Sequence, residues 1–406
     1  MNKTYINRPL YTERVRPFIG KQLIKVLTGQ RRVGKSYILL QLMDVIKEQD
    51  PSAHIIHIDK EQLAFSTIKD SGTLYEYVCS QLENSSNYLF IDEVQEITDF
   101  QLCLRSLLNE NKCDIYCTGS NAKMLSGELA TYLGGRYMEF PVHALSYPEF
   151  ITFNCLQASD ESLQLYLTLG GMPYIHNLTL EKNIIYEYLR NVYSTILLKD
   201  VVTRESIRNV SFLENLVVYL TDNTGSLFSA QNISKYLKSQ HINIPTQTIL
   251  NYLKALCNSF FIYKVQRADV NGLKIFEIGE KYYFEDLGIR NSIRRFNFRN
   301  DINKLMENIV YMDLIRYGYS VHIGKNENKE IDFIAEKGDE KIYIQVTYML
   351  YDEQTIQREF GGLMEIANHY PKYVVTMDKM PIGGNYKGIK QIYLGDFLSA
   401  TDKSKI

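Results

Sequence analysis

Several residue types are scarce in this chain, and each scarcity excludes a class of protein. Tryptophan is absent, and the 406 residues include only nine prolines and six cysteines. The nearest two cysteines, Cys113 and Cys117, would lie about 13 Å apart in a strand, too far for a disulfide. We therefore expect free, buried thiols in a reducing compartment rather than a disulfide framework. The seven histidines are scattered, without a helical pair beside a carboxylate, which argues against a zinc site.

Long apolar runs and an excess of one charge are also lacking. Residues 1–20 contain no stretch typical of a signal peptide, and no run approaches the length of a membrane span. We therefore expect a cytoplasmic protein without a membrane partner. The net charge is −2, so the chain as a whole does not attract nucleic acid, and any contact with DNA requires a local patch.

The remaining composition is that of a soluble globular protein. Hydrophobic residues make up 45% of the chain and charged residues 23%. The length is too great for one ordinary core, so we expect roughly two to four domains.

A phosphate-binding pattern occurs near the N-terminus. Residues 23–27 (LIKVL) predict a short buried strand, and residues 37–43 (YILLQLM) predict the start of a helix with an apolar face. Between them lies GQRRVGKS, which matches G-x-x-x-x-G-K-[ST] in the required strand–loop–helix context. Its glycines let consecutive backbone N–H groups converge on phosphate oxygens at the positive end of the helix. The candidate nucleotide-binding residues are Gly29, Gln30, Arg31, Arg32, Val33, Gly34, Lys35, Ser36 and Tyr37.

Two adjacent acidic residues, Asp92 and Glu93, are expected to lie beside this loop. The sequence NYLFIDEVQE predicts a buried strand that ends at Asp92 and Glu93, and the carboxyl ends of parallel strands face the ligand crevice. We expect Lys35 to reach the β- and γ-phosphates and Ser36 to ligate Mg²⁺. Asp92 would hold the same ion, and Glu93 would act as general base on the attacking water.

The order of motifs resembles a known family. VLTGQRRVGKS, LFIDEVQ, TGSNAKML, GGRYMEFPVHALSYPEF, GGMP, LKDVVTR, KYYFEDLGIRN and EIDFIAEKGDEKIYIQV occur in this order in bacterial and archaeal AAA-type P-loop ATPases. That group joins its ATPase core to a C-terminal domain of unknown function. The resemblance covers nearly the whole chain and implies ATP binding and hydrolysis, with ATP and Mg²⁺ as cofactors.

The resemblance implies further site residues. In AAA-type ATPases a polar residue after the next strand reads the γ-phosphate, which points here to Ser120 or Asn121; helix capping by either residue is an equal alternative. Arg136 is the first candidate for a cation that stabilises the transferred charge, and Arg204 is the second. If a neighbouring subunit supplies that arginine, the protein forms a homo-oligomer.

The middle of the chain predicts a winged helix. Three helical patterns, starting near residues 212, 230 and 246, precede two strand patterns that flank ADVNG as a hairpin. Such a fold can place its third helix in the major groove of DNA. That helix would expose Thr246, Gln247, Asn251 and Lys254, a polar but weakly basic set, so a protein-packing role is the preferred alternative.

The tail resembles metal-dependent nucleases with parts missing. A helix carrying Glu307 precedes strands carrying Asp332 and then Gln345-x-Thr347. The resemblance implies Glu-x-Lys at the last position, so a carboxylate and the cation are both replaced by neutral residues. We expect a nuclease-shaped domain without cleavage, and ordinary structural acids are the alternative for Glu307 and Asp332.

These patterns predict an α/β protein: a P-loop NTPase parallel sheet with a helical lid, a winged helix and a nuclease-like α/β C-terminal domain. The expected boundaries are 1–145 for the ATPase core, 146–210 for the lid, 211–290 for the winged helix and 291–406 for the tail. The expected function is a Mg-dependent ATPase whose cycle repositions the C-terminal domains. The alternatives are a slow-hydrolysing nucleotide switch for a protein or DNA partner and, less favoured, an ATP-driven nuclease.

Overall fold

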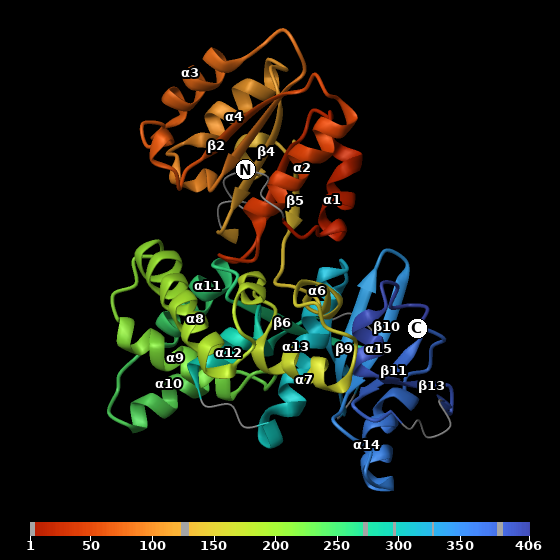
Figure 1. Cartoon of the computed structure of the whole chain (residues 1–406). Helices are drawn as coiled ribbons and strands as arrows, with labels where there is room; N and C mark the ends of the chain where they lie inside the picture. Colours follow the sequence, from red (N-terminus) through yellow and green to blue (C-terminus); the bar gives the residue numbers. More distant parts are fainter. Residues whose placement is uncertain (1–4, 123–129, 271–274, 295–297, 327–328, 380–384) are drawn as a thin grey trace. The chain divides into compact units, whose positions relative to one another are not determined.

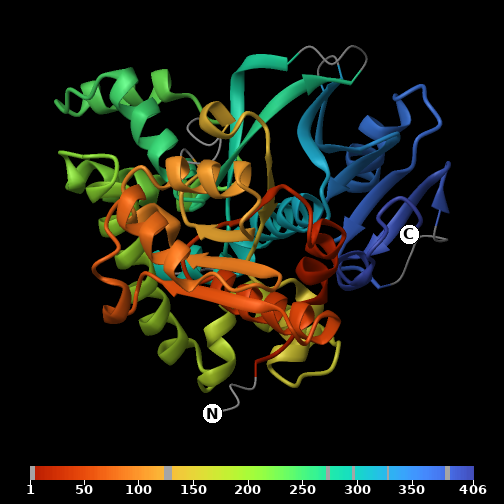
Figure 2. The same ribbon diagram turned by 90° about the horizontal axis from the view of Figure 1, so that it is seen from above.

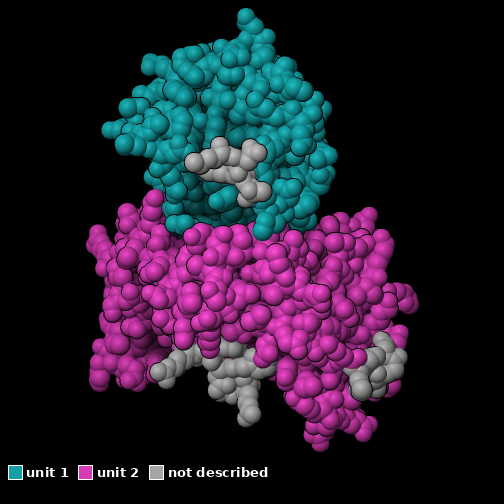
Figure 3. All heavy atoms as spheres, in the orientation of Figure 1, with its two compact units in different colours: residues 1–143, 258–260 teal, residues 144–257, 261–406 magenta. Residues whose placement is uncertain are grey.

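The chain folds into two compact units. The computed structural model describes residues 5–122, 130–270, 275–294, 298–326, 329–379 and 385–406. The first unit contains residues 1–143 and 258–260, and the second contains residues 144–257 and 261–406 (Figure 3). The expected end of the ATPase core, at residue 145, falls two residues from this division.

The first unit is a parallel sheet with helices packed against it (Figure 1). Its strands are β1 (Ile24–Thr28), β2 (His54–Asp59), β3 (Asn87–Asp92), β4 (Asp114–Gly119) and β5 (Tyr137–Pro141). Its helices are α1 (Pro9–Val15), α2 (Lys35–Gln49), α3 (Ser71–Gln81), α4 (Phe100–Asn109) and α5 (Ala130–Leu133). All five residues of β1 are buried, as expected for a strand of a parallel sheet covered on both faces.

The strand order of this sheet positions the site. The order is β2-β3-β4-β1-β5, and every pair is parallel. Strand β4 therefore lies between β1, which leads into the glycine loop, and β3, which ends in the acidic pair. The carboxyl ends of all three strands meet at one edge, which confirms the predicted parallel sheet.

The second unit combines helices with an eight-stranded mixed sheet. Its helices are α6 (Tyr147–Phe153), α7 (Asp160–Leu169), α8 (Lys182–Thr195), α9 (Val210–Asp222), α10 (Ala230–Ser239), α11 (Thr246–Asn258), α12 (Leu287–Ile293), α13 (Phe298–Arg316), α14 (Glu353–Met364) and α15 (Leu394–Ser399). Its strands are β6 (Ile262–Asp269), β7 (Ile275–Phe284), β8 (Ser320–Asn326), β9 (Lys329–Lys337), β10 (Glu340–Val346), β11 (Lys372–Thr376), β12 (Asn385–Tyr386) and β13 (Ile389–Tyr393). Within the ranges given above, no helix has both the length and the apolar character needed to cross a bilayer.

The second half forms one compact unit, and its predicted division into a lid, a winged helix and a tail stays a prediction. The three helices and the hairpin expected for a winged helix are present as α9–α11 and β6–β7. However, the hairpin is not a separate wing, because β6 pairs in parallel with β8 and so extends the C-terminal sheet (Figure 2). The boundary expected at residue 290 therefore falls inside one compact unit, as does the boundary at 210. Two strands far apart in sequence share one sheet, a pairing that local patterns do not reveal.

The stretch EDLGIRN, residues 285–291, joins two helices of this unit through hydrogen bonds. Asp286 caps α12 by accepting from Ile289 N at 2.8 Å, and its second oxygen accepts from Gly171 N at 2.6 Å. Burial raises the pKa of the Asp286 carboxyl to about 7, against the lowering effect of these backbone donors. Asn291 donates to the carbonyl oxygens of Leu167 and Thr168, both at 3.0 Å. The end of α7 is therefore fixed to α12 by hydrogen bonds at both ends of the short helix.

Gly288 tests how tight this contact is. A Cβ atom at Gly288 would lie 1.9 Å from the Leu169 carbonyl oxygen, which is backbone and cannot turn aside. We expect Gly288→Ala to lower the free energy of unfolding of this unit by about 3 kcal/mol. Gly362→Ala in α14 is the matched control, because its Cβ would meet nothing nearer than 3.8 Å. Denaturant unfolding of both variants measures the difference, and equal midpoints would contradict the prediction.

Candidate phosphate-binding site

The loop between β1 and α2 has the backbone that the sequence pattern requires. Gly29 has φ +143° and Gly34 has φ +98°, conformations that disfavour other residues. A Cβ atom at Gly29 would lie only 2.1 Å from the carbonyl oxygen of Val142. Gly34 precedes the first residue of α2, so the backbone N–H groups at the start of this helix border the loop.

Lys35 is folded over this loop. Its side chain is 4% exposed, and Nζ donates to the carbonyl oxygens of Gly29 and Gln30, each at 3.0 Å. Nζ also lies 4.0 Å from Oε1 of Glu93. The Lys35 ammonium group, at the start of α2, thus lies between the loop and the residue that follows β3.

Asp92 and Ser36, the two expected magnesium ligands, meet in the structure. Burial raises the pKa of Asp92, while hydrogen bonds from Ser36 and Thr118 act in the opposite direction. Thr118, at the end of β4, donates its hydroxyl to Oδ1 of Asp92. The same hydroxyl oxygen accepts from the backbone N–H of Glu93 at 2.8 Å. One threonine therefore holds both members of the acidic pair.

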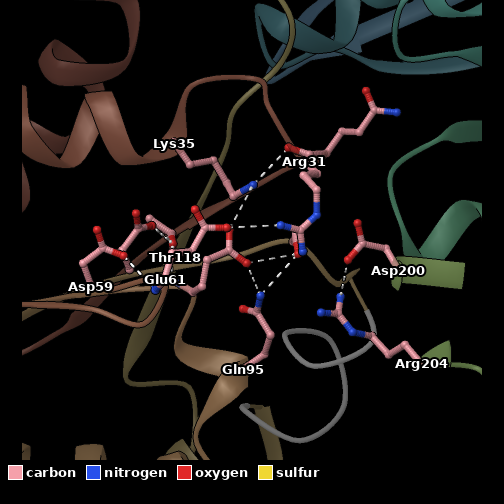
Figure 4. Close-up of polar contacts among 12 residues, drawn as sticks. Arg31, Lys35, Asp59, Glu61, Gln95, Thr118, Asp200 and Arg204 are labelled. Atoms are coloured by element: carbon pink, nitrogen blue, oxygen red, sulfur yellow. Dashed lines mark hydrogen bonds and ion pairs between the residues drawn. The ribbon is translucent and has the colours of Figure 1, made fainter. Parts of the chain in front are cut away.

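Glu93 is held in an unusual conformation by polar neighbours. Its φ of +56° is rare for a residue with a side chain and costs conformational energy. Oε2 of Glu93 accepts from Nε2 of Gln95, and the Ser120 hydroxyl donates to the same oxygen at 3.4 Å. Lys35, Thr118 and Gln95 converge from three different elements (Figure 4). Ser120 therefore lies beside the expected general base, and its predicted contact with the γ-phosphate stays a prediction.

The site fits a nucleoside triphosphate with its magnesium ion. The side-chain oxygens of Gln30 and Gln95 are buried without a hydrogen-bond partner among the described residues. Buried polar atoms are normally paired, so these two oxygens call for additional donors such as bound water molecules. A hydroxyl and a carboxylate meet at Ser36 and Asp92, which is a hard-oxygen donor set of the kind that Mg²⁺ selects.

The other predicted loop residues divide into buried and exposed ones. Val33 is fully buried, and its carbonyl oxygen accepts from Arg8 Nη1 at 2.8 Å. Arg31 is largely buried, and its Nη1 lies 3.4 Å from Oε1 of Glu61 (Figure 4). Arg32 and Tyr37 are exposed to solvent. Asn121, the alternative to Ser120, is also buried at the end of β4.

Arg136 is not brought to this cluster within one chain. Its carbonyl oxygen accepts from Ile24 N, which places it beside the first residue of β1, whereas the loop follows the last. The two ends of this strand are roughly 13 Å apart. Its guanidinium is exposed and donates to Asn109 at 2.7 Å. Within its own chain Arg136 therefore lies at the opposite end of β1 from the phosphate loop, and its role as an arginine supplied by a neighbouring subunit stays a prediction.

Arg204 lies in the second unit. It follows a π-helical segment, Ile196–Thr203, and its Nη1 is 3.4 Å from Oδ1 of the buried Asp200 (Figure 4). π-helical turns are rare and are frequently found at functional sites. A catalytic role for Arg204, or for Arg136 of a second copy, stays a prediction.

Two residues of the cluster were missed by the sequence reasoning. Neither Thr118 nor Gln95 is among the site residues predicted from the sequence. Thr118 lies at the carboxyl end of the buried strand β4, and Gln95 lies three residues after the end of β3. Polar side chains at the carboxyl ends of parallel strands face the crevice in which ligands bind. The position of Gln95, two residues after Glu93, is the sequence feature that could have identified it as a site residue.

Removing the Thr118 hydroxyl should weaken the site and the unit. Thr118→Val keeps the shape but leaves Oδ1 of Asp92 and the N–H of Glu93 without this partner, at a cost of roughly 1–3 kcal/mol. Thr118→Ser loses a methyl group and keeps the hydroxyl, so we expect a smaller loss. Denaturant unfolding measures both, and a Val variant as stable as the Ser variant would contradict this role.

Comparison with known proteins places the chain in a family. A model described as an AAA domain matches residues 21–151, and a model described as a domain of unknown function matches residues 160–300. An uncharacterized protein of Haemophilus influenzae is 33% identical over 405 residues, covering 98% of this chain and 100% of the relative. An uncharacterized protein of Methanocaldococcus jannaschii is 29% identical over 351 residues, covering 83% of this chain and 77% of the relative.

Among solved structures, the similarity is weak. The Aeropyrum pernix ORC1 protein, solved in complex with DNA, is 10% identical with a TM-score of 0.33, covering 71% of this chain and 92% of that one. The Thermotoga maritima RuvB Holliday junction branch migration motor is 14% identical with a TM-score of 0.32, covering 63% and 86%. The AAA-type prediction is confirmed by the matched domain, whereas the nuclease-like character of the tail stays a prediction. Because the identity extends over both whole chains, the protein belongs to the same family as the Haemophilus influenzae protein, with an AAA domain in its N-terminal part.

Proposed function

We propose that the first unit binds ATP with Mg²⁺ and hydrolyses it. One observation carries this proposal: the loop lysine, the Ser36–Asp92 pair and Glu93 converge at one sheet edge, where Thr118 hydrogen-bonds to both acids. These groups are supplied by the start of α2 and the end of β3, two elements far apart in the sequence, so their convergence is a property of the fold. The family match to an AAA domain supports the same reading.

In this proposal each residue of the site has a separate role. Lys35 neutralises charge on the β- and γ-phosphates, and the N–H groups of the loop bind their oxygens. Bound between Ser36 and Asp92, magnesium would neutralise the charge that develops on the phosphate oxygens. Glu93 accepts the proton of the attacking water, and Gln95 and Ser120 orient its carboxylate.

The proposal is tested with two substitutions and one control. Lys35→Ala should abolish detectable Mg·ATP binding in calorimetry, because it removes the ammonium group from the phosphate position. Glu93→Gln should retain binding and lower turnover on the order of 10²–10⁴-fold, the range for losing a general base. Glu76→Gln, an exposed acid on α3, should behave as the parent.

Hydrolysis by Glu93→Gln at the parental rate would overturn the base assignment. A failure of well-folded parent protein to bind Mg·ATP would overturn the whole proposal.

The contacts of Glu93 favour a slow-hydrolysing switch as the second function. Oε2 already accepts from Gln95 and Ser120, and Oε1 lies 4.0 Å from the Lys35 ammonium. These contacts must be exchanged before the carboxylate can hold water. Slow turnover without a partner and stimulation by one would support the switch, and fast turnover by the isolated protein would support a constitutive ATPase.

The charge distribution of α10 and α11 favours DNA as that partner. No acidic residue occurs between Asp222 and Asp269, whereas five cations do: Lys235, Lys238, Lys254, Lys264 and Arg267. The last two are neutralised, since Lys264 lies 2.9 Å from Glu280 and Arg267 lies 4.0 Å from Glu330. The other three are exposed, and the described part of the chain gives them no ion pair. Tyr236, which is 63% exposed, adds an aromatic face of the kind on which bases stack.

Replacing Lys235, Lys238 and Lys254 together by Gln should weaken duplex binding and its salt dependence. Each lost phosphate contact lowers the slope of log K against log salt by about 0.9, so the slope should fall by up to about 2.7. Lys182, Lys387 and Lys405, exposed lysines elsewhere, form the matched triple control. Fluorescence anisotropy at several salt concentrations measures both. Equal slopes for the two triple variants would remove these helices as the DNA surface and leave a protein partner.

A further inference from the structure

A buried lysine lies among the acids of the predicted nuclease-like region. Nζ of Lys281, on β7, lies 2.9 Å from Oε1 of Glu330, 3.3 Å from Oε2 of Glu307 and 3.8 Å from Oδ1 of Asp332. Its side chain is 4% exposed. Glu307 belongs to α13 and the other two acids belong to β9, so three elements meet at this ammonium group. We call these four residues the Lys281 cluster.

Further hydrogen-bond donors approach two of these carboxylates. Tyr283 donates its hydroxyl to Oε2 of Glu307 at 3.1 Å, and the backbone N–H of Val346 donates to Oδ2 of Asp332 at 2.8 Å. Gln345, at the position where a nuclease would carry a carboxylate, accepts from the backbone N–H of Asp332 at 3.4 Å. Gly225 leaves the space for Glu307, because a Cβ atom there would lie 2.9 Å from Oε2.

In the Lys281 cluster, one buried ammonium group compensates three carboxyl groups. Carboxylates taken out of water are costly unless a cation and hydrogen bonds compensate them. Burial raises the pKa of Asp332 well above its usual range, and the neighbouring Glu307 adds to the effect. Burial also raises the pKa of Glu307, against the attraction of Lys281. The Lys281 pKa is raised despite burial, because Glu307, Asp332 and Glu330 stabilise the ammonium form.

The geometry leaves no place for a second cation. A divalent metal ion needs carboxylate oxygens at roughly 2.0–2.6 Å on several sides. Here the ammonium nitrogen occupies the space between the three carboxylates. In the described ranges, no group of three or more His, Cys, Asp or Glu side chains is arranged so that it could hold a metal ion.

We propose that the Lys281 ammonium takes the place that a divalent metal ion would hold between Glu307 and Asp332. The C-terminal sheet then needs no metal for its stability and lacks the ion that activates water for phosphodiester cleavage. The cation that sequence reasoning found missing at Thr347 is thus present, but it is supplied by β7 and serves as a permanent counter-ion. This inference is independent of the ATPase proposal, because it concerns only residues of the second unit.

Manganese titration of the nucleotide-free full chain tests whether Lys281 takes the place of a metal ion. Lys281→Ala should create a Mn²⁺ site, seen in calorimetry as binding at least tenfold tighter than the parent shows and as a rise in the unfolding temperature with Mn²⁺. Lys281→Arg retains a cation and should gain nothing. Adding Glu307→Gln to Lys281→Ala should abolish the gain.

The parent protein provides a second test that needs no folded Lys281 variant. Its response to Mn²⁺ should equal that of Asp332→Asn, and neither protein should nick plasmid DNA with Mg²⁺ or Mn²⁺. Mn²⁺ binding or nicking that Asp332→Asn abolishes would overturn the proposal. A well-folded Lys281→Ala variant that binds Mn²⁺ no better than the parent would overturn it as well.

Discussion

The candidate phosphate site depends on the hydroxyl group of Thr118, because this group hydrogen-bonds to both residues of the acidic pair, Asp92 and Glu93. It donates to the Asp92 carboxylate and accepts from the Glu93 backbone. Both bonds require β4 to lie beside β3, and the loop lysine reaches Glu93 only because β4 is flanked on its other side by β1. The strand order therefore determines the distances between the Lys35 ammonium group and the Asp92 and Glu93 carboxylates.

The second unit uses buried charge in a different way. Asp286 and the Lys281 cluster both hold ionisable groups away from water, yet each group has partners from several elements. A buried charge that loses one partner is costly, so such groups oppose any rearrangement that would separate their elements. Asp286 fixes α7 to α12, and Lys281 fixes the β6–β7 hairpin to α13 and β9. The unit is therefore held together by polar contacts at two places as well as by its apolar core.

The sequence alone predicted those parts of the molecule that local patterns determine. The glycine loop, Lys35, Ser36 and the Asp92–Glu93 pair follow from residues adjacent in the chain, and the structure brings them together. Arg136 precedes β5 at the end of the sheet opposite the loop, and local patterns do not show at which end of a sheet a residue will lie. Lys281 could not be found because its partners lie 26 to 51 residues further along the chain, on elements whose pairing is a tertiary property. The shared hairpin was missed for the same reason: no turn or periodicity signals that β6 will lie beside β8.

The pairing of β6 with β8 determines how the protein can be divided for study. A fragment cut at residue 290, where the sequence pattern changes, would leave one side of β8 with unsatisfied backbone donors and acceptors. Exposed strand edges of this kind promote association between molecules. The same cut would separate Lys281 from Glu307, Glu330 and Asp332, leaving three carboxylates in a pocket built around an ammonium group. Measurements on such a truncated tail would describe an electrostatic environment that the intact polypeptide does not contain.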